Sequence, residues 1–142
     1  MSDIRDNTER QDDTRRAPRY TPIIFPRPAD DLYLLMQNYL RGRGLDLGLA
    51  LDNGWYPTTE AGDTIPRIVI PGTMTSNGRF WQARRMVGEG EPRYQSPHAP
   101  REGSVILVAP RGVAPGKAVV TEGPMCALAA AGEGWWGIAL MG

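Results

Sequence analysis

Cysteine, histidine and lysine each occur only once in this chain of 142 residues, as Cys126, His98 and Lys117. A closed structural zinc site needs four cysteine or histidine ligands, so the sequence excludes such a zinc site, and it excludes a disulfide within the chain. Because lysine is so rare, arginine supplies fifteen of the sixteen basic residues. This preference suits bidentate contacts with phosphate, and it also arises from the codon usage of a GC-rich genome.

Net charge and long apolar runs are missing as well. The sixteen basic and sixteen acidic residues cancel, so the chain as a whole carries no electrostatic signature of nucleic-acid or membrane binding. No apolar window approaches the length of a membrane span, and the charged N-terminus does not have the pattern of a signal peptide. We therefore expect a cytoplasmic protein that does not bind membranes.

The first 28 residues contain charges of both signs and few apolar side chains. A segment of this composition cannot offset the entropy that is lost on ordering, so we expect residues 1–28 to form a disordered tail. The residues from Ala29 onward are enough for one domain with a single hydrophobic core.

Two helices are predicted at the start of this domain. Residues 29–41 carry leucine and tyrosine at spacings of three and four, with acidic residues in the first turn and Gly42 just beyond the end. A second, shorter helix over residues 45–51 is predicted to begin near Asp46 and to stop before Gly54. Together the two helices are expected to form a helical hairpin whose leucines pack on a sheet.

The pattern becomes that of strands from residue 67 onward. A β-branched run at 67–71, a turn signal at Asn77-Gly78 and a second run at 79–87 predict an antiparallel hairpin. We expect one face of the second strand to meet a ligand or a partner, because both faces mix apolar and polar side chains. Residues 89–103 contain three prolines and no periodic pattern, which predicts a long loop.

Strands are also predicted at 104–110, 118–121 and 136–140, with a helix at 125–131. The order of strand, helix and strand at the end predicts a βαβ-like unit with a parallel pair. The fold class is therefore α+β, with N-terminal helices, an antiparallel hairpin and a mixed sheet.

Glu122 stands where the predicted strand 118–121 meets the next helix. Gly123 and Pro124 are predicted to form a tight turn there, with proline at the first helical position. An acid at this place either stabilises the positive end of the helix dipole or serves as a catalytic or metal-binding carboxylate. The residues alone leave both interpretations open. Cys126, on the same helix, is expected to be a small buried apolar residue.

Four parts of the chain carry motifs in an informative order. They are Tyr39–Leu45, with the pattern Tyr-Leu-x-x-Arg-Gly, then Gly78–Arg84, Pro92–Pro97, and Val119–Leu128 together with Trp136–Gly142. The set resembles the catalytic core of bacterial and phage-type DNA primases, in which a basic N-terminal subdomain precedes a Toprim fold. The resemblance covers about four fifths of the chain, from near Asp31 to the end. It implies that residues 29–117 form the N-terminal subdomain and that residues 118–142 form an incomplete Toprim-like α/β unit.

The resemblance implies nucleotidyl transfer in the DNA replication of a phage or mobile element. Glu122 corresponds to the Toprim glutamate, which acts as a general acid/base or as a ligand of Mg²⁺. The implied ligands are single-stranded DNA and nucleotides.

Five residues are candidates for binding nucleic acid or nucleotides. Arg84, Arg93 and Tyr94 match the positions that line the cleft in primases of this type, where arginine binds phosphate and tyrosine can stack on a base. Arg79 and Gln82 belong to the same strand as Arg84 and are further candidates for this surface.

Two features depart from the primase pattern. Cys126 occupies the position where these primases usually carry Asp, and a thiol is not a hard oxygen ligand for Mg²⁺. The later Asp-x-Asp motif does not occur before Gly142, so Mg²⁺ is expected only if a partner, such as a second primase polypeptide, completes the site. A helicase is another expected partner. An open edge on the last strand would suit pairing with a second chain.

Two alternatives to a split primase stay open. One is a non-catalytic nucleic-acid-binding or regulatory module with a degenerate Toprim site, which would bind nucleic acid without a metal ion. The other is a truncated gene product without an independent role.

Overall fold

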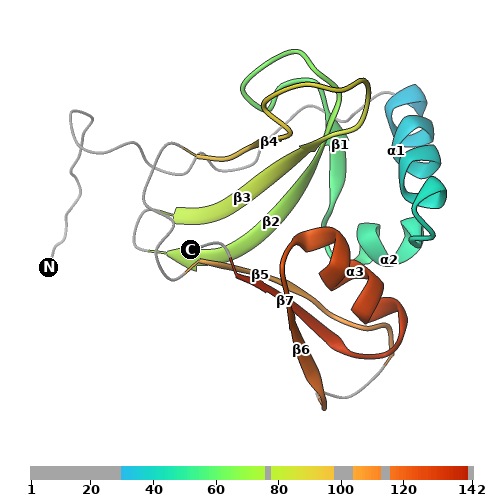
Figure 1. Cartoon of the computed structure of the whole chain (residues 1–142), viewed down its shortest axis with the longest axis vertical. Helices are drawn as coiled ribbons and strands as arrows, with labels where there is room; N and C mark the ends of the chain where they lie inside the picture. The colour runs from blue at the N-terminus through green and yellow to red at the C-terminus, as the bar shows by residue number, and fades with distance from the viewer. Residues whose placement is uncertain (1–29, 76–77, 98–103, 113–115, 141–142) are drawn as a thin grey trace, which may run out of the picture.

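The structure is a computed structural model of the chain, and it describes residues 30–75, 78–97, 104–112 and 116–140. These residues form an α+β fold, as predicted, with three helices and two sheets (Figure 1). The predicted tail of residues 1–28, Asn77 of the predicted turn and His98 lie outside the described residues. In chain order the elements are α1 (Asp30–Gly42), α2 (Leu47–Asp52), β1 (Tyr56–Thr58), β2 (Arg67–Thr75), β3 (Gly78–Arg85), β4 (Tyr94–Gln95), β5 (Val105–Val108), β6 (Ala118–Thr121), α3 (Pro124–Gly132) and β7 (Trp136–Leu140).

The first sheet is built on the predicted hairpin. β2 and β3 pair antiparallel, and β1 and β4 extend the hairpin on its two sides in the order β1-β2-β3-β4. The register shifts between Pro71 and Met74, which marks a β-bulge. Next to the bulge the Val105 N–H donates to Thr73 Oγ1 over 3.2 Å, and this hydrogen bond joins β2 to the start of β5.

The prediction of a plain loop over residues 89–103 is wrong in one part. Tyr94 and Gln95 pair with Arg84 and Ala83 of β3 and form the short strand β4. A strand of two residues is too short to show the alternation of apolar and polar residues by which strands are predicted from sequence. Its position is fixed instead by a side chain of β2, because Arg67 donates hydrogen bonds to backbone carbonyls just before β4.

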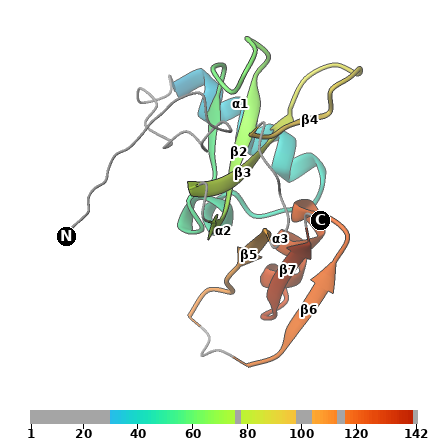
Figure 2. The same ribbon diagram turned by 90° about the vertical axis from the view of Figure 1, so that its left-hand side faces the viewer.

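Helices α1 and α2 cover one face of this sheet (Figures 1 and 2). Met36 and Leu40 of α1 and Leu49 and Ala50 of α2 are buried. Leu34 is exposed, so the leucines of α1 do not all face the sheet as predicted.

Polar side chains fix both ends of α2. The Asp46 carboxylate caps its start, as the sequence predicts, by accepting from the Gly48 N–H at 2.8 Å and the Leu49 N–H at 3.3 Å. At the other end the Asn53 amide donates to Leu49 O and to Ala109 O, and it accepts from the Ala109 N–H at 2.8 Å. Asn53 therefore ties the end of α2 to the chain that leaves β5.

The second sheet has the strand order β5-β7-β6. β6 and β7 are parallel and are connected through α3, which confirms the predicted βαβ-like unit, whereas β5 and β7 are antiparallel. The sheet is therefore mixed, as predicted. The helix α3 packs against all three strands and against α2. Because β5 pairs with β7, the second sheet includes residues from Val105 onward.

The expectation of an open edge on the last strand is wrong. β7 is the central strand of its sheet and pairs with β5 on one side and β6 on the other. The chain reaches this position because the crossover from β6 through α3 returns beside β6, while β5 lies on the other side of β7. The outer strands of the sheet are β5 and β6.

The two sheets share one hydrophobic cluster. It includes Met36 of α1, Phe80 of β3, Ile106 of β5 and Leu128 of α3, all of them almost completely buried. A smaller cluster around Val69 and the neighbouring Ala83 lies on the opposite face of the first sheet. Within the described residues, no helix has the length and apolar character needed to cross a membrane.

Candidate nucleic-acid interface

Arg84 and Tyr94 are directly opposite each other on β3 and β4. Side chains at opposed positions of antiparallel strands project from the same face, so these two side chains meet. The Cζ atom of Arg84 lies 5.1 Å from the centre of the Tyr94 ring and 5.9 Å from the centre of the Tyr39 ring. At these distances the negative faces of the rings attract the guanidinium. The structure therefore brings together two of the residues predicted to bind nucleic acid.

The end of α1 is organised by a Schellman motif. The Gly44 N–H donates to Arg41 O and the Leu45 N–H donates to Leu40 O, each over 2.9 Å. Gly44 has a φ of +73°, the left-handed conformation that favours glycine. The sequence prediction placed the terminating glycine at Gly42, which is instead the last residue of the helix.

This helix end positions Arg43 beside the strands. Arg43 precedes the left-handed Gly44, and its Cζ atom lies 4.6 Å from the centre of the Tyr39 ring. Tyr39 and Arg43 are four residues apart, the spacing that places side chains on the same face of a helix. The guanidinium of Arg43 also lies at the C-terminal end of α1, where the helix dipole favours a positive charge. We term Tyr39, Arg43, Arg84 and Tyr94 the Arg–Tyr cluster.

The Arg–Tyr cluster is anchored on one side and open on the other. Tyr39 and Tyr94 pack on the main hydrophobic cluster, whereas Arg43 is exposed. Burial raises the pKa of Tyr94, although the Arg84 guanidinium beside it acts in the opposite direction. Within the described part of the chain, Arg84 Nε and the Tyr39 hydroxyl are buried and have no hydrogen-bond partner. Such atoms are rare in folded proteins, and they suit a site that a ligand or water completes.

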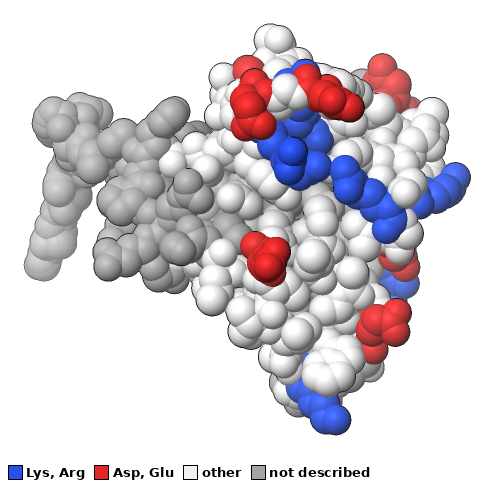
Figure 3. Space-filling model, viewed as in Figure 1, with Lys and Arg blue, Asp and Glu red and all other residues white. Residues whose placement is uncertain are grey.

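Basic side chains gather on the same part of the molecule. Figure 3 shows a band of blue atoms that runs from the region of β3 and β4 to the C-terminal part of α1, with acidic side chains at one end of the band. The chain is neutral overall, so this positive surface is a local feature. A local concentration of one sign attracts ligands of the opposite sign.

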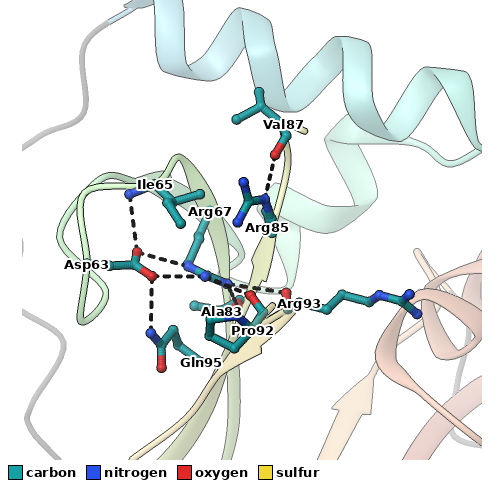
Figure 4. Close-up of polar contacts among 9 residues, drawn as sticks. All are labelled: Asp63, Ile65, Arg67, Ala83, Arg85, Val87, Pro92, Arg93 and Gln95. Carbon is teal, nitrogen blue, oxygen red and sulfur yellow. Dashed lines mark hydrogen bonds and ion pairs between the residues drawn. The ribbon is translucent and has the colours of Figure 1, made fainter. Parts of the chain in front are cut away.

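Arg67 supports the strands of the cluster from within. Its side chain is completely buried, and each of its five N–H groups has an acceptor (Figure 4). Nε and Nη2 donate to the two carboxylate oxygens of Asp63 at 3.0 and 2.9 Å. The other three N–H groups donate to the carbonyl oxygens of Ala83, Pro92 and Arg93. Arg67 therefore joins β2, β3 and the segment that leads into β4.

Asp63 is the counter-ion of this buried arginine. Its carboxylate accepts from Arg67, from the side-chain amide of Gln95 at 3.1 Å and from the Ile65 N–H at 3.2 Å. The hydrogen bonds from Arg67 are the main cause that lowers the pKa of Asp63 to about 2. The pair is consequently charged at any physiological pH and holds Gln95 of β4 in place.

Arg93 contributes its backbone and its side chain to different functions. Its carbonyl accepts from Arg67 Nη1 and from the Arg85 N–H at 2.9 Å. Its side chain is exposed and extends away from the Arg67 network in Figure 4. Arg85 turns to the chain instead, because its Nε donates to Val87 O over 2.7 Å. Of these two arginines, Arg93 is the more exposed.

Arg79 and Gln82 do not belong to the Arg–Tyr cluster. Arg79 is near the opposite end of β3 from Arg84, about 17 Å away at about 3.4 Å per residue, and its Nη1 donates to Gly72 O over 2.8 Å. Gln82 projects from the same face of β3 as Arg84 and the buried Phe80, but it is only 8% exposed and is not among the residues that form the ring contacts of the cluster.

Glu122 lies at the junction of β6 and α3 and is exposed, with Pro124 as the first residue of α3, as predicted. Thr121 Oγ1 donates to Gly123 O over 3.0 Å and thereby fixes the turn. Among the described residues, no group of three or more His, Cys, Asp or Glu side chains is arranged so that it could hold a metal ion. Cys126 is exposed, so the expectation that it is buried is wrong, because it projects from the outer side of α3.

Sequence reasoning missed several residues of this region. Tyr39 and Arg43 lie in a motif of the primase resemblance, and their spacing of four residues on a helix was the available signal. Arg67 and Asp63 are also four residues apart but not on a helix, so nothing in the sequence indicates their pairing.

No protein-family model matches the chain, and no curated protein or solved structure matches it significantly.

Proposed function

We propose that this chain is a primase-like protein of phage or mobile-element DNA replication, and that it binds single-stranded DNA and nucleotide phosphates in the cytoplasm at the Arg–Tyr cluster. The observation that carries the proposal is the convergence of Arg43 and Arg84, from segments far apart in the sequence, on the ring of Tyr39. Tyr94, from a third segment, completes the group. Each of these segments also belongs to a motif of the primase resemblance.

The chemistry of the cluster supports phosphate binding. Arginine presents a planar fork of N–H groups that matches phosphate oxygens. Every phosphate that a cationic side chain neutralises releases counterions from the nucleic acid, so the affinity of such a site falls as the salt concentration rises. Arg93, which is exposed beside Tyr94 in the sequence, adds a third positive charge at the edge of β4.

The test is the binding of a fluorescent single-stranded oligonucleotide, followed by anisotropy over a range of salt concentrations. Arg84→Ala is expected to weaken binding about tenfold and to reduce the slope of log K against log salt by about one. The matched control is Arg111→Ala, which removes the same charge from an exposed arginine that pairs with Asp52 at 3.1 Å. The control is expected to bind as the unaltered protein does, and an equal loss in both variants would contradict the proposal.

Glu122 lies outside the Arg–Tyr cluster. It supplies one exposed carboxylate, and magnesium in nucleotidyl-transfer sites is usually held by one or two carboxylates together with substrate phosphates. Glu122 alone does not form a magnesium site, so we assign it no catalytic step. Glu122→Gln is expected to leave oligonucleotide binding largely intact. If it weakens binding as much as Arg84→Ala does, the two residues do not have separate functions.

A non-catalytic nucleic-acid-binding or regulatory module is the second candidate function. It is favoured by Cys126, which presents a thiol to solvent in the first turn of α3, four residues after Glu122. Magnesium separates the two candidates. Binding that is equal in magnesium and in EDTA, without nucleotide incorporation, indicates a module. Metal-dependent incorporation that Glu122→Gln abolishes indicates an enzyme.

A further inference from the structure

The rings of Tyr39 and Tyr94 are already in use within the protein. The Arg84 guanidinium lies over both rings, and the Arg43 guanidinium lies over that of Tyr39. Both tyrosines also pack on the main hydrophobic cluster. A nucleic-acid base that stacked on either ring would have to displace an arginine or part of the core. This arrangement differs from the sequence-based expectation that Tyr94 stacks on a base.

The arginines, in contrast, keep hydrogen-bonding capacity. A guanidinium that lies over an aromatic ring uses its flat face there, and its N–H groups remain at its edge. Arg84 Nε has no hydrogen-bond partner among the described residues. In Arg67, by contrast, all five N–H groups donate to acceptors within the protein itself. Arg67 is a structural arginine. Arg84 also forms a hydrogen bond with Tyr94, but its Nε has no acceptor among the described residues.

We propose that Tyr39 and Tyr94 are positioning residues that hold the Arg84 guanidinium, and that the cluster consequently recognises the sugar-phosphate backbone of a single strand and not its bases. This inference rests on the proposed function, and it specifies which part of the single-stranded DNA the cluster contacts. The recognised chemistry is a series of phosphodiesters, so binding depends little on base identity and not at all on stacking by these tyrosines.

The first arm of the test uses the unaltered protein. Its affinity is measured by anisotropy for an oligothymidylate and for an oligonucleotide of the same length in which every nucleotide is abasic. The inference predicts dissociation constants that agree within about threefold, because both probes carry the same phosphates. An oligothymidylate that binds about tenfold tighter than the abasic probe overturns the inference, since stacking on aromatic side chains is worth that much or more per base.

The second arm separates positioning from stacking with variants of Tyr94. Tyr94→Phe keeps the ring beneath Arg84, and as the conservative variant it is expected to retain most of the binding to both probes that Tyr94→Leu loses. Tyr94→Leu removes the ring beneath Arg84 and is expected to weaken binding to both probes by the same factor, about fivefold to tenfold. If Tyr94→Leu weakens binding only to the oligothymidylate, Tyr94 stacks on bases and the inference is wrong.

Failure of the inference can be distinguished from failure of the proposed function. If neither probe binds the unaltered protein at low salt, the proposed function fails, and the inference fails with it. If both probes bind and only the oligothymidylate responds to Tyr94→Leu, the proposed function stands and the inference alone is overturned. Arg111→Ala, which removes an exposed arginine outside the Arg–Tyr cluster that pairs with Asp52 at 3.1 Å, is a further control that is expected to bind both probes normally.

Discussion

Arg67 and Arg84 show how surroundings divide the roles of identical side chains. Arg67 is buried at the first position of β2, where one carboxylate and three carbonyl groups take all of its donors. Arg84 is half-buried near the end of β3, where aromatic rings hold its flat faces. A buried charge with a complete set of partners stabilises a conformation, whereas a charge held by rings remains able to bind an anion. The Arg67–Asp63 pair thus shapes the strands on which the Arg–Tyr cluster depends.

Replacement of Asp63 by Asn is expected to remove a pH-dependent part of the stability. The folded state lowers the pKa of Asp63 from 3.8 to about 2, so this contribution is complete above about pH 4 and is lost as the pH falls through about 2. The shift corresponds to about 2 kcal/mol at most, and solvent reduces that figure because a quarter of the side chain is exposed. Urea unfolding at neutral pH should show Asp63→Asn to be less stable than the unaltered protein.

The same comparison at lower pH provides the check. The difference in the free energy of unfolding between the two proteins should shrink between pH 4 and about pH 2, because protonated Asp63 no longer has the charge that Arg67 stabilises. A difference that stays constant over this range would show that the carboxylate charge of Asp63 does not contribute.

At the scale of elements, the end of α1 determines where Arg43 lies. The Schellman hydrogen bonds and the positive φ of Gly44 turn the chain directly after Arg43, and the guanidinium returns over the helix to Tyr39. The sequence predicts this helix correctly but ends it at the first of two glycines. Both Gly42 and Gly44 satisfy the preference for glycine near a helix end, so composition cannot separate them, whereas the backbone hydrogen bonds do.

Paired alanine substitutions distinguish the two glycines. Gly44→Ala is expected to lower the free energy of unfolding by about 1 kcal/mol, since its φ of +73° is unfavourable for a residue with a Cβ atom. Gly42→Ala is expected to raise it by up to about 1 kcal/mol, because alanine is the better helix former. Beyond the neighbouring residues of the chain, no atom of the described residues lies within 4 Å of the Cβ position at either glycine, so a steric clash does not contribute to either change in stability. Thermal unfolding measures both, and equal destabilisation would contradict this helix end.

Regular periodicity decided which elements could be predicted. The β2–β3 hairpin, the capped start of α2 and the strand, helix and strand of β6, α3 and β7 were predictable because each has a repeated pattern or a specific turn residue. The strand β4 was not predictable, since its pairing depends on long-range hydrogen bonds from Arg67.

The candidate site was predictable only in part. Arg84 and Tyr94 came from motifs, but their contact with Tyr39 and Arg43 depends on how α1 docks on the sheet.

At the scale of the whole molecule, the main hydrophobic cluster crosses from one sheet to the other. Side chains of α1 and β3 meet those of β5 and α3 within it. Gly137 of β7 lies directly against the Ala127 carbonyl of α3, so that a Cβ atom at Gly137 would overlap it. A shared core predicts that the described elements unfold together as one cooperative unit.

Gly137→Ala tests this cooperativity. The added methyl group has to push α3 from β7, and both contacting groups are backbone, so we expect a loss of about 3 kcal/mol in the free energy of unfolding. Gly132→Ala is the control, because open space surrounds that position on α3, and it should change stability by less than about 1 kcal/mol. Native-state hydrogen exchange then shows in which elements the backbone amides lose protection. If the core is shared, protection falls by a similar factor in the β2–β3 hairpin and in β5 and β7, whereas a loss confined to the second sheet would mean that the two sheets unfold independently.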